Sequence, residues 1–283
     1  MPSEHPPALL PGATLGMLGG GQLGMYFTLA AQRLGYRVVV LDPDPASPAG
    51  RIADEHLCAG YDDATALARL AACDAVTTEF ENVPAATLTL LAARTRVAPA
   101  AAAVAIAQDR AAEKTWLAQH GFATAPFAVI AAASDLDAAP VGYPAILKVA
   151  RLGYDGKGQA RVGNADEART AFAGFGGQAC VLEGLVAFDA EISVVLARAY
   201  DGSVAAFPPA ENHHANGILD TSVVPARLPA AVQAQAVAEA TRLAKALDYV
   251  GVMAVEFFVE GGQLRVNEIA PRPHNSGHYT LDA

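Results

Sequence analysis

The densest group of chemically active side chains lies at residues 265–278, RVNEIAPRPHNSGH. The preceding apolar run, residues 252–259 (VMAVEFFV), carries Glu256 in its middle. A buried carboxylate is costly unless it is paired or bound to a metal ion. Two facing carboxylates, Glu256 and Glu268, would suit Mg²⁺, which prefers oxygen ligands and leaves room for phosphate oxygens. We predict these two residues as metal ligands; the alternative is a pair of solvated glutamates.

The turn between the two runs decides whether these glutamates face each other. It contains Gly261 and Gly262, the residue type that tight hairpin turns require. A three-residue loop at 261–263 places Glu256 opposite Glu268 on one face of the hairpin. A two-residue loop instead pairs Glu256 with Asn267 and separates the carboxylates. We predict the three-residue loop, because it builds the metal site.

A glycine-rich loop at residues 19–24, GGGQLG, is the second candidate site. It lies between an apolar strand at 14–18 and a helical pattern at 25–34, and a second strand at 38–41 ends at Asp42. This strand–loop–helix–strand outline favours phosphate binding, because glycines let a phosphate approach the backbone N–H groups of a helix N-terminus. Taken alone, the loop leaves a dinucleotide-binding oxidoreductase and other phosphate-binding proteins equally open.

Ligands of open parallel sheets bind at the carboxyl ends of the strands. A further apolar strand at 75–80, AVTTEF, leads directly into polar residues. We therefore expect one pocket lined by Gln22, Asp42, Glu79, Glu81 and Asn82.

Basic and glycine-rich residues recur after residue 108. A helix predicted at 111–120 follows Arg110, and a strand predicted at 143–150 carries Lys148 among apolar neighbours. The loop that follows, residues 153–159 (GYDGKGQ), has glycine hinges that allow it to fold over a triphosphate while its lysine offsets the anionic charge. A plain hairpin turn is the alternative. No Ser or Thr follows that lysine, so the loop is not the common Gly-x-x-x-x-Gly-Lys-Ser/Thr nucleotide loop.

The later strands carry fewer candidates. A strand at 180–183 leads into residues 184–186, a hinge where adenine would meet backbone groups, and a strand at 191–196 begins with Glu191, which can hold ribose hydroxyls. Residues 208–219 are polar and are predicted to lie between strands, with His213 and His214 pointing to opposite sides. Residues 229–247 are predicted to form an amphipathic helix.

Composition excludes several classes of protein. The chain has 283 residues, 53% of them hydrophobic, which indicates a packed globular enzyme of about two domains. Its net charge of −10 and lack of a basic cluster argue against nucleic acid as a partner. Three cysteines without metal-ligand spacing suit a reducing cytoplasm. No apolar run approaches the ~20 residues that cross a bilayer, so we expect no membrane partner and a cytoplasmic location.

Five segments together resemble the ATP-grasp superfamily and, within it, the N5-carboxyaminoimidazole ribonucleotide synthases of purine biosynthesis. They are GGGQLG at 19–24, FENV at 80–83, LKVARLGYDGKGQ at 147–159, EGLV at 183–186 and NEIAPRPHNSGH at 267–278. A sister family, the formate-dependent glycinamide ribonucleotide formyltransferases, is similar. It typically has Ser-Ser in place of Tyr154-Asp155 and Asp-Thr in place of Asn275-Ser276, so the synthases are favoured.

The resemblance implies roles for individual residues. The nucleotide-binding set is Arg110, Lys148, Gly153, Tyr154, Asp155, Gly156, Lys157, Gly158, Gln159, Glu183, Gly184, Leu185, Val186, Glu191, His214, Asn267 and Glu268. The catalytic set is Arg272, His274, Asn275, Lys157, Asp155 and Tyr154, with Arg272 holding bicarbonate. The ribonucleotide-binding set is Gln22, Leu23, Glu79 and Asn82. Glu256 and Glu268 would ligate Mg²⁺.

The resemblance also implies the fold, an α/β and α+β chain. Residues 1–108 are expected to form a Rossmann-like parallel-sheet domain, followed by the two lobes of an ATP-grasp at 109–186 and 187–283. ATP and Mg²⁺ would support carboxylation of 5-aminoimidazole ribonucleotide by bicarbonate through carboxyphosphate, in a homodimer. The small C-terminal domain of the family is absent from this sequence. A truncated ATP-binding protein with little activity is therefore a further hypothesis.

Overall fold

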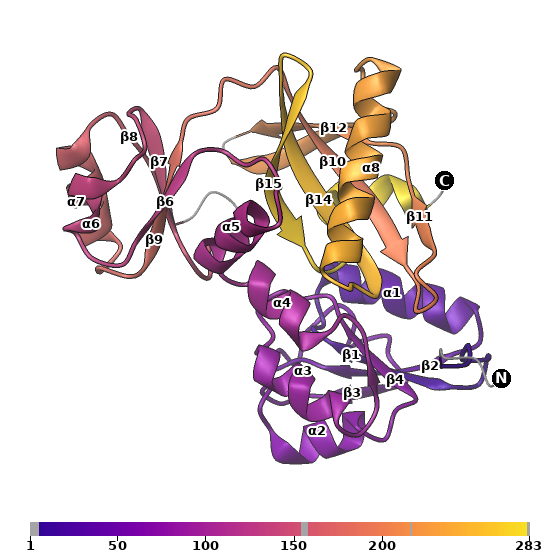
Figure 1. The fold of residues 1–283 in the computed structure, drawn as a ribbon. Helices are drawn as coiled ribbons and strands as arrows, with labels where there is room; N and C mark the ends of the chain where they lie inside the picture. The colour runs from indigo at the N-terminus through magenta and orange to yellow at the C-terminus, as the bar shows by residue number, and fades with distance from the viewer. Residues whose placement is uncertain (1–5, 154–157, 216, 282–283) are drawn as a thin grey trace.

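The first of three sheets is parallel and contains the glycine loop. A computed structural model describes residues 6–153, 158–215 and 217–281. The sheet has the order β3-β2-β1-β4-β5, from strands Thr14–Leu18 (β1), Arg37–Leu41 (β2), Glu55–Leu57 (β3), Ala75–Thr78 (β4) and Arg96–Val97 (β5). Helices Gln22–Arg33 (α1), Ala64–Leu70 (α2), Ala85–Ala92 (α3) and Ala101–Ala107 (α4) accompany it (Figure 1). Apolar strands buried on both faces, such as Arg37–Leu41 (RVVVL), are typical of such a sheet.

The second sheet is antiparallel and carries Lys148. Its order is β6-β9-β7-β8, from strands Phe127–Ile130 (β6), Ala145–Val149 (β7), Gln159–Val162 (β8) and Cys180–Gly184 (β9). Helices Asp135–Ala138 (α6) and Ala165–Gly174 (α7) lie on its outer side (Figure 1). Alternating burial along β7 leaves Lys148 on the face away from this small core.

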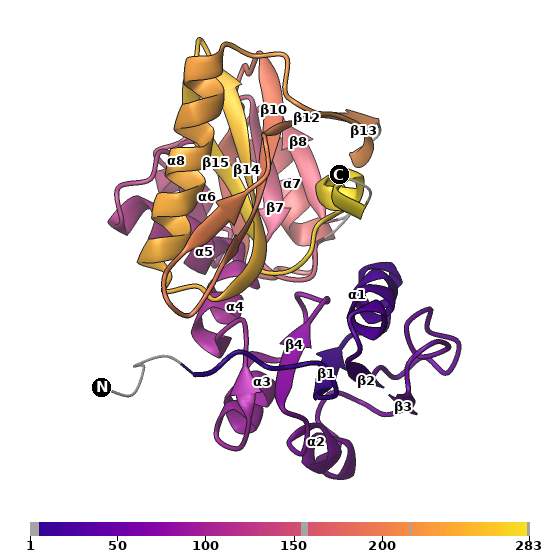
Figure 2. The ribbon, with the colours of Figure 1, turned by 90° about the vertical axis from the view of Figure 1, so that its right-hand side faces the viewer.

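The third sheet carries both candidate metal ligands. Its path is β13-β12-β10-β14-β15, with β11 paired to β10, and its strands are Ala190–Arg198 (β10), Val204–Ala206 (β11), Ala210–Ala215 (β12), Ile218–Val223 (β13), Gly251–Glu260 (β14) and Gln263–Ala270 (β15). Helix Ala230–Ala246 (α8) covers one face, and helix Arg110–Gln119 (α5) lies between this sheet and the second. A 3₁₀ segment, Asn275–Leu281 (η1), follows β15 and lies near α1, where the rings of Tyr26 and His278 meet edge to face at 5.7 Å (Figure 2).

The predicted parallel-sheet domain followed by two α+β lobes is confirmed, and the sheets of both lobes are antiparallel. Helix α1 begins at Gln22 rather than at residue 25, because the third glycine of the loop already serves as its N-cap. The segment 208–219, predicted to lie between strands, contains β12 and the start of β13. Its polar residues gave no alternating pattern, since they hydrogen-bond to each other and to neighbouring strands.

The hairpin between β14 and β15 places Glu256 opposite Glu268 through a β-bulge that the sequence did not predict. Its loop has two residues, Gly261 and Gly262, with φ of 56° and 79°, so the predicted three-residue loop is wrong. That loop alone would pair Glu256 with Asn267. A β-bulge adds Asn267 to β15 as an extra residue, and Glu256 therefore pairs with Glu268. The predicted pairing of the glutamates is confirmed, because the shift of register arises inside the ladder.

Candidate active site

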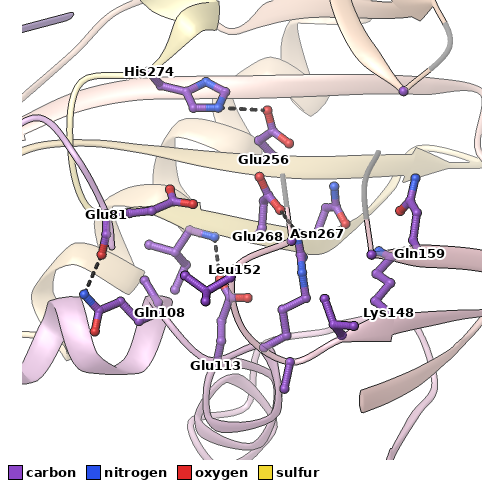
Figure 3. Close-up of a pocket in the computed structure, with 18 of the residues that line it drawn as sticks. Glu81, Gln108, Glu113, Lys148, Leu152, Gln159, Glu256, Asn267, Glu268 and His274 are labelled. Carbon is purple, nitrogen blue, oxygen red and sulfur yellow. Dashed lines mark hydrogen bonds and ion pairs between the residues drawn. The ribbon is translucent and has the colours of Figure 1, made fainter. Parts of the chain in front are cut away.

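A cavity of about 370 Å³ lies where the three sheets meet. Polar and charged residues from β7, β10, β12, β14, β15 and α5 surround it (Figure 3). Among the predicted site residues, its walls contain Asn82, Arg110, Lys148, Gly153, Gly158, Gln159, Glu191, His214, Glu256, Asn267, Glu268, Arg272, His274 and Asn275. The structure thus collects residues separated by as many as 193 positions into one site.

Glu256, Glu268 and His274 offer atoms that all lie within 4.8 Å of one another. Burial, and then the charge of Glu268, raises the pKa of Glu256 well above its ordinary value. Burial also raises the pKa of Glu268, but the charge and hydrogen bond of Arg110, together with other nearby groups such as Lys148, outweigh burial and leave that pKa at about 2. Burial, reinforced by the charge of Arg272, lowers the pKa of His274 to about 4. A divalent cation would relieve the repulsion between the two carboxylates.

The neighbouring amide oxygen supports an oxygen-rich cation site. Asn267 Oδ1 is buried and has no hydrogen-bond partner among the residues that the structure describes. The other amide atom, Nδ2, donates to Glu191 Oε1 at 3.4 Å, which holds the amide in place. Carboxylate and amide oxygens are the ligands that Mg²⁺ accepts, so Glu256 and Glu268 fit this ion, with Asn267 beside them.

Two cationic side chains that line the cavity are each paired with a carboxylate. Arg110 Nη2 lies 3.0 Å from Glu268 Oε2, and Lys148 Nζ lies 2.9 Å from Glu183 Oε2. Each cation is thus held in place by one carboxylate while lining the cavity. An anion such as a phosphate group would find two oriented positive charges here, in surroundings with little water to screen them.

Two buried ionisable side chains of α5, Glu113 and Lys114, bind the backbone of β15 next to this site. Lys114 is fully buried; its Nζ donates to the Asn267 carbonyl at 2.8 Å and lies 3.7 Å from Glu183 Oε1. The backbone N–H of Ile269 donates to Glu113 Oε1 at 2.6 Å, and burial raises the pKa of Glu113 to about 8. Helix α5 therefore holds the backbone of β15 on both sides of Glu268.

Arg272 links the last strand to the first domain. Its Nη2 and Nε donate to Glu81 Oε2 at 2.6 and 3.0 Å, and its Nη1 donates to the Pro273 carbonyl. The side chain of Gln108 lies beside this pair and donates to the Glu81 carbonyl. Both ends of this bridge line the cavity, so the parallel-sheet domain forms one of its walls.

The opposite wall combines an ion pair with aromatic surface. His214 Nδ1 lies 3.1 Å from Glu191 Oε2, and the hydrogen bond between them raises the pKa of His214. Phe188 and Phe258 stack with ring centroids 4.7 Å apart and also line the cavity. His213 Nε2 lies 3.2 Å from Glu211 Oε1 instead, so the two neighbouring histidines have different partners.

The glycine loop does not join this cavity. The N–H of Gly20 donates to Asp42 Oδ2 at 2.7 Å, and the N–H of Gly21 donates to Glu79 Oε1 at 2.8 Å. Protein carboxylates thus occupy the positions that a cofactor phosphate would take in a dinucleotide-binding loop. The predicted single pocket lined by Gln22, Asp42, Glu79, Glu81 and Asn82 is wrong, since two of the carboxylates turn into the loop.

Gln22 lines a second cavity, of about 350 Å³, on the other side of the domain junction. Its other lining residues are Leu219, Asp220, Ser222, Asn275, Ser276, His278 and Tyr279. Asn275 and Leu219 line both cavities, so the two cavities adjoin at the start of η1 and at β13. The loop at 19–24 thus contributes the N-terminal end of α1 to this second cavity.

Some predicted residues lie outside both linings. Glu79 and Leu23 line neither cavity, and the same holds for Glu183, Gly184, Leu185 and Val186, although Glu183 binds the cavity residue Lys148. Tyr154, Asp155, Gly156 and Lys157 lie outside the described residues. The sequence did not predict a role for Glu113, Lys114, Phe188 or Phe258. The one available signal was a Glu-Lys pair in an alanine-rich helix, which also describes an ordinary exposed helix.

The parallel sheet followed by two antiparallel sheets around a site of carboxylates and cations defines an ATP-grasp protein. The model of the ATP-grasp domain matches residues 115–283, and that of the ribonucleotide synthetase preATP-grasp domain matches residues 12–108.

Two curated relatives narrow this class. The N5-carboxyaminoimidazole ribonucleotide synthase of Brucella melitensis is 47% identical over 96% of this chain and 77% of its own length. That of Bacillus subtilis is 41% identical over 97% and 73%. The chain belongs to the N5-carboxyaminoimidazole ribonucleotide synthase family.

Solved structures agree. An N5-carboxyaminoimidazole ribonucleotide synthetase in complex with ADP superposes with a TM-score of 0.93 at 40% identity, covering 97% of this chain and 74% of that one. The synthase of Aspergillus clavatus, in complex with ADP and 5-aminoimidazole ribonucleotide, superposes with a TM-score of 0.88 at 30% identity, covering 95% and 72%.

Proposed function

We propose that this chain uses ATP and bicarbonate to carboxylate the 5-amino group of 5-aminoimidazole ribonucleotide, giving N5-carboxyaminoimidazole ribonucleotide, ADP and phosphate. The observation that carries the proposal is the bulged hairpin that sets Glu256 opposite Glu268 beside Arg110 and Lys148. The identity of the substrates is inferred from membership of the synthase family. The internally capped glycine loop leaves no basis for the oxidoreductase alternative.

The nucleotide would bind in the larger cavity. Arg110 and Lys148 would contact its phosphates, and Glu191, paired with His214, would accept from the ribose hydroxyls. Mg²⁺, held by Glu256 and Glu268, would supply charge neutralisation between the reacting anions. In the family's reaction, bicarbonate attacks the γ-phosphate and forms carboxyphosphate, so two anions must be brought together.

Arg272 would hold the bicarbonate. The carboxylate of Glu81 holds the guanidinium of Arg272 at the wall where the parallel-sheet domain meets the cavity. The ribonucleotide would lie in the second cavity with its phosphate near Gln22, and Asn275 lies where the two cavities adjoin. This arrangement would place the amino group close to the carboxylate donor and away from bulk water.

The test is ADP release in the presence of ATP, Mg²⁺ and bicarbonate, with and without 5-aminoimidazole ribonucleotide. We expect release that depends on the ribonucleotide, and turnover stimulated instead by formate and glycinamide ribonucleotide would contradict the proposal. Glu268→Gln should abolish Mg²⁺-dependent turnover. Glu260→Gln is the matched control, because Glu260 lies on the same hairpin, is 41% exposed and pairs only with Arg265 among the described residues. Nucleotide binding without product would indicate the truncated, inactive alternative.

A homodimer and a cytoplasmic location remain predictions from the family resemblance. No helix in the described ranges is both long and apolar enough to cross a membrane. Sedimentation of the purified chain would test the dimer.

A further inference from the structure

A buried chain of hydrogen bonds runs from the edge of the second cavity to His274. Ser222 Oγ lies 2.8 Å from Asn212 Oδ1, Asn212 Nδ2 lies 3.0 Å from Ser193 Oγ, and Ser193 Oγ lies 2.7 Å from Ser276 Oγ. Ser276 Oγ then lies 2.8 Å from His274 Nδ1. Ser193, Asn212 and Ser276 are all more than nine-tenths buried, so water does not compete for these bonds.

The direction of every bond in this chain follows from one backbone group. The N–H of Ser276 points at His274 Nδ1 at 3.3 Å, and a backbone N–H can only donate. Nδ1 must therefore be an acceptor, so the Ser276 hydroxyl also donates to it and must accept from Ser193. Ser193 then has no hydrogen left and accepts from the Asn212 amide. Consistently, the amide nitrogen faces Ser193 and the amide oxygen faces Ser222.

The other ring nitrogen consequently carries the proton. His274 Nε2 lies 3.5 Å from Glu256 Oε1, on the side of the carboxylate pair (Figure 3). A protonated ring nitrogen cannot ligate a metal ion, although the position of Nε2 would suit one. The same N–H faces Glu256, whose pairing with Glu268 forms the candidate Mg²⁺ site.

We propose that Ser276, supported by Ser193 and Asn212, is a positioning residue that holds His274 with its proton on Nε2, directed at Glu256. His274 then serves the site as a hydrogen-bond donor and not as a metal ligand. The consequence for turnover rests on the proposed function, whereas the tautomer of His274 does not.

The test is long-range ¹H–¹⁵N NMR on the ¹⁵N-labelled chain, with the His274 signals identified by their loss in His274→Gln. We expect Nδ1 to show the shift of an unprotonated nitrogen and Nε2 that of a protonated one, before and after addition of Mg²⁺. A proton on Nδ1 in the unmodified protein, or loss of the Nε2 proton on adding Mg²⁺, would overturn the proposal. This measurement requires neither ATP nor ribonucleotide, so it is independent of the ADP-release assay.

Asn212→Asp tests the direction of the chain. A carboxylate at this position can only accept, and charge-assisted hydrogen bonds are about twice as strong as neutral ones, so Ser193 would donate to it in place of Ser276. Ser276 would then donate to Ser193, and His274 would carry its proton on Nδ1 at the expense of the long 3.3 Å contact from the Ser276 N–H. Ser222→Ala is the matched control, because it removes the far end and leaves the Asn212 amide donating to Ser193. We expect the tautomer to change in the first variant and not in the second; no change in either would refute the role of the chain. If Asn212→Asp does not fold, the NMR measurement on the unmodified protein still shows which ring nitrogen of His274 carries the proton.

Turnover supplies a second readout. Without the Nε2 proton that faces Glu256, the charge arrangement at the carboxylate pair changes, and kcat should fall by about tenfold in Asn212→Asp. KM for ATP should stay within about twofold, since this proton faces the carboxylate pair and not the nucleotide wall. Equal loss in both constants would indicate general damage to the site.

Discussion

Lys114→Met should be among the most destabilising single changes in this chain. The lysine is fully buried, and its ammonium group binds the carbonyl of the bulge residue Asn267 and one oxygen of Glu183. Burial lowers the pKa of Lys114, with the charge of Glu183 acting against it. Methionine retains the approximate length and the helix propensity, so the change isolates the charge.

The expected loss follows from these contacts. A hydrogen bond to a charged group contributes about 1.5–3 kcal/mol, and its removal leaves the Asn267 carbonyl unpaired. Removing one partner of a buried ion pair costs about 3–5 kcal/mol, because the remaining charge is uncompensated. Lys148 still contacts the second oxygen of Glu183, which places the expected loss near the lower end, at about 3 kcal/mol.

Urea unfolding measures this loss directly, with the slope of the transition showing whether two-state behaviour persists. Lys245→Met is the matched control, because Lys245 is exposed on the last turn of α8 and should change stability by less than about 0.5 kcal/mol. A loss below about 1 kcal/mol in Lys114→Met would refute this role of Lys114. A second check is Lys114→Met combined with Glu183→Gln, which should be less destabilising than the sum of the single changes.

Three further predictions concern other parts of the chain. The guanidinium of Arg227 lowers the pKa of Glu211 to about 2 from an ordinary value of 4.5, so this pair stabilises the fold above pH 4.5 and the contribution fades as the pH falls toward 2. Arg227→Ala should therefore lower the urea midpoint at pH 7 and much less at pH 3. Gly24→Ala should cost about 1–3 kcal/mol in thermal unfolding, because its new Cβ would lie 2.9 Å from the Gly19 carbonyl oxygen. Glu256→Gln removes a carboxyl that burial and Glu268 keep from ionising in the fold but that ionises freely in the unfolded chain, so it should raise stability at pH 7 by about 1 kcal/mol without Mg²⁺, while abolishing any Mg²⁺-dependent shift of the unfolding midpoint. A midpoint that still responds to Mg²⁺ would exclude Glu256 as a ligand.

Local sequence patterns predicted many of the strands and turns of the fold. Apolar runs such as residues 38–41 and 252–259 form strands, because short runs rich in β-branched and aromatic residues favour a buried sheet. The glycines at 19–24 predicted a tight strand-to-helix turn for a similarly local reason. Most candidate site residues after position 108 line the larger cavity, as expected. They lie on neighbouring strands or on the loops next to them, so sheet formation places them close together.

Sequence by itself thus determined the order of the elements, the sheet types and the chemical nature of the site. Only the tertiary structure decided which groups meet. The bulge at Asn267 sets the pairing of Glu256 and Glu268, and no local pattern announces a bulge that depends on contacts with α5. Likewise, Glu79 caps Gly21 from 58 residues away, which converts an apparent cofactor loop into an internally satisfied one. Contacts of this kind join residues that are far apart in the sequence. Their interaction free energies arise only when the fold brings the two partners together, so no local pattern predicts them.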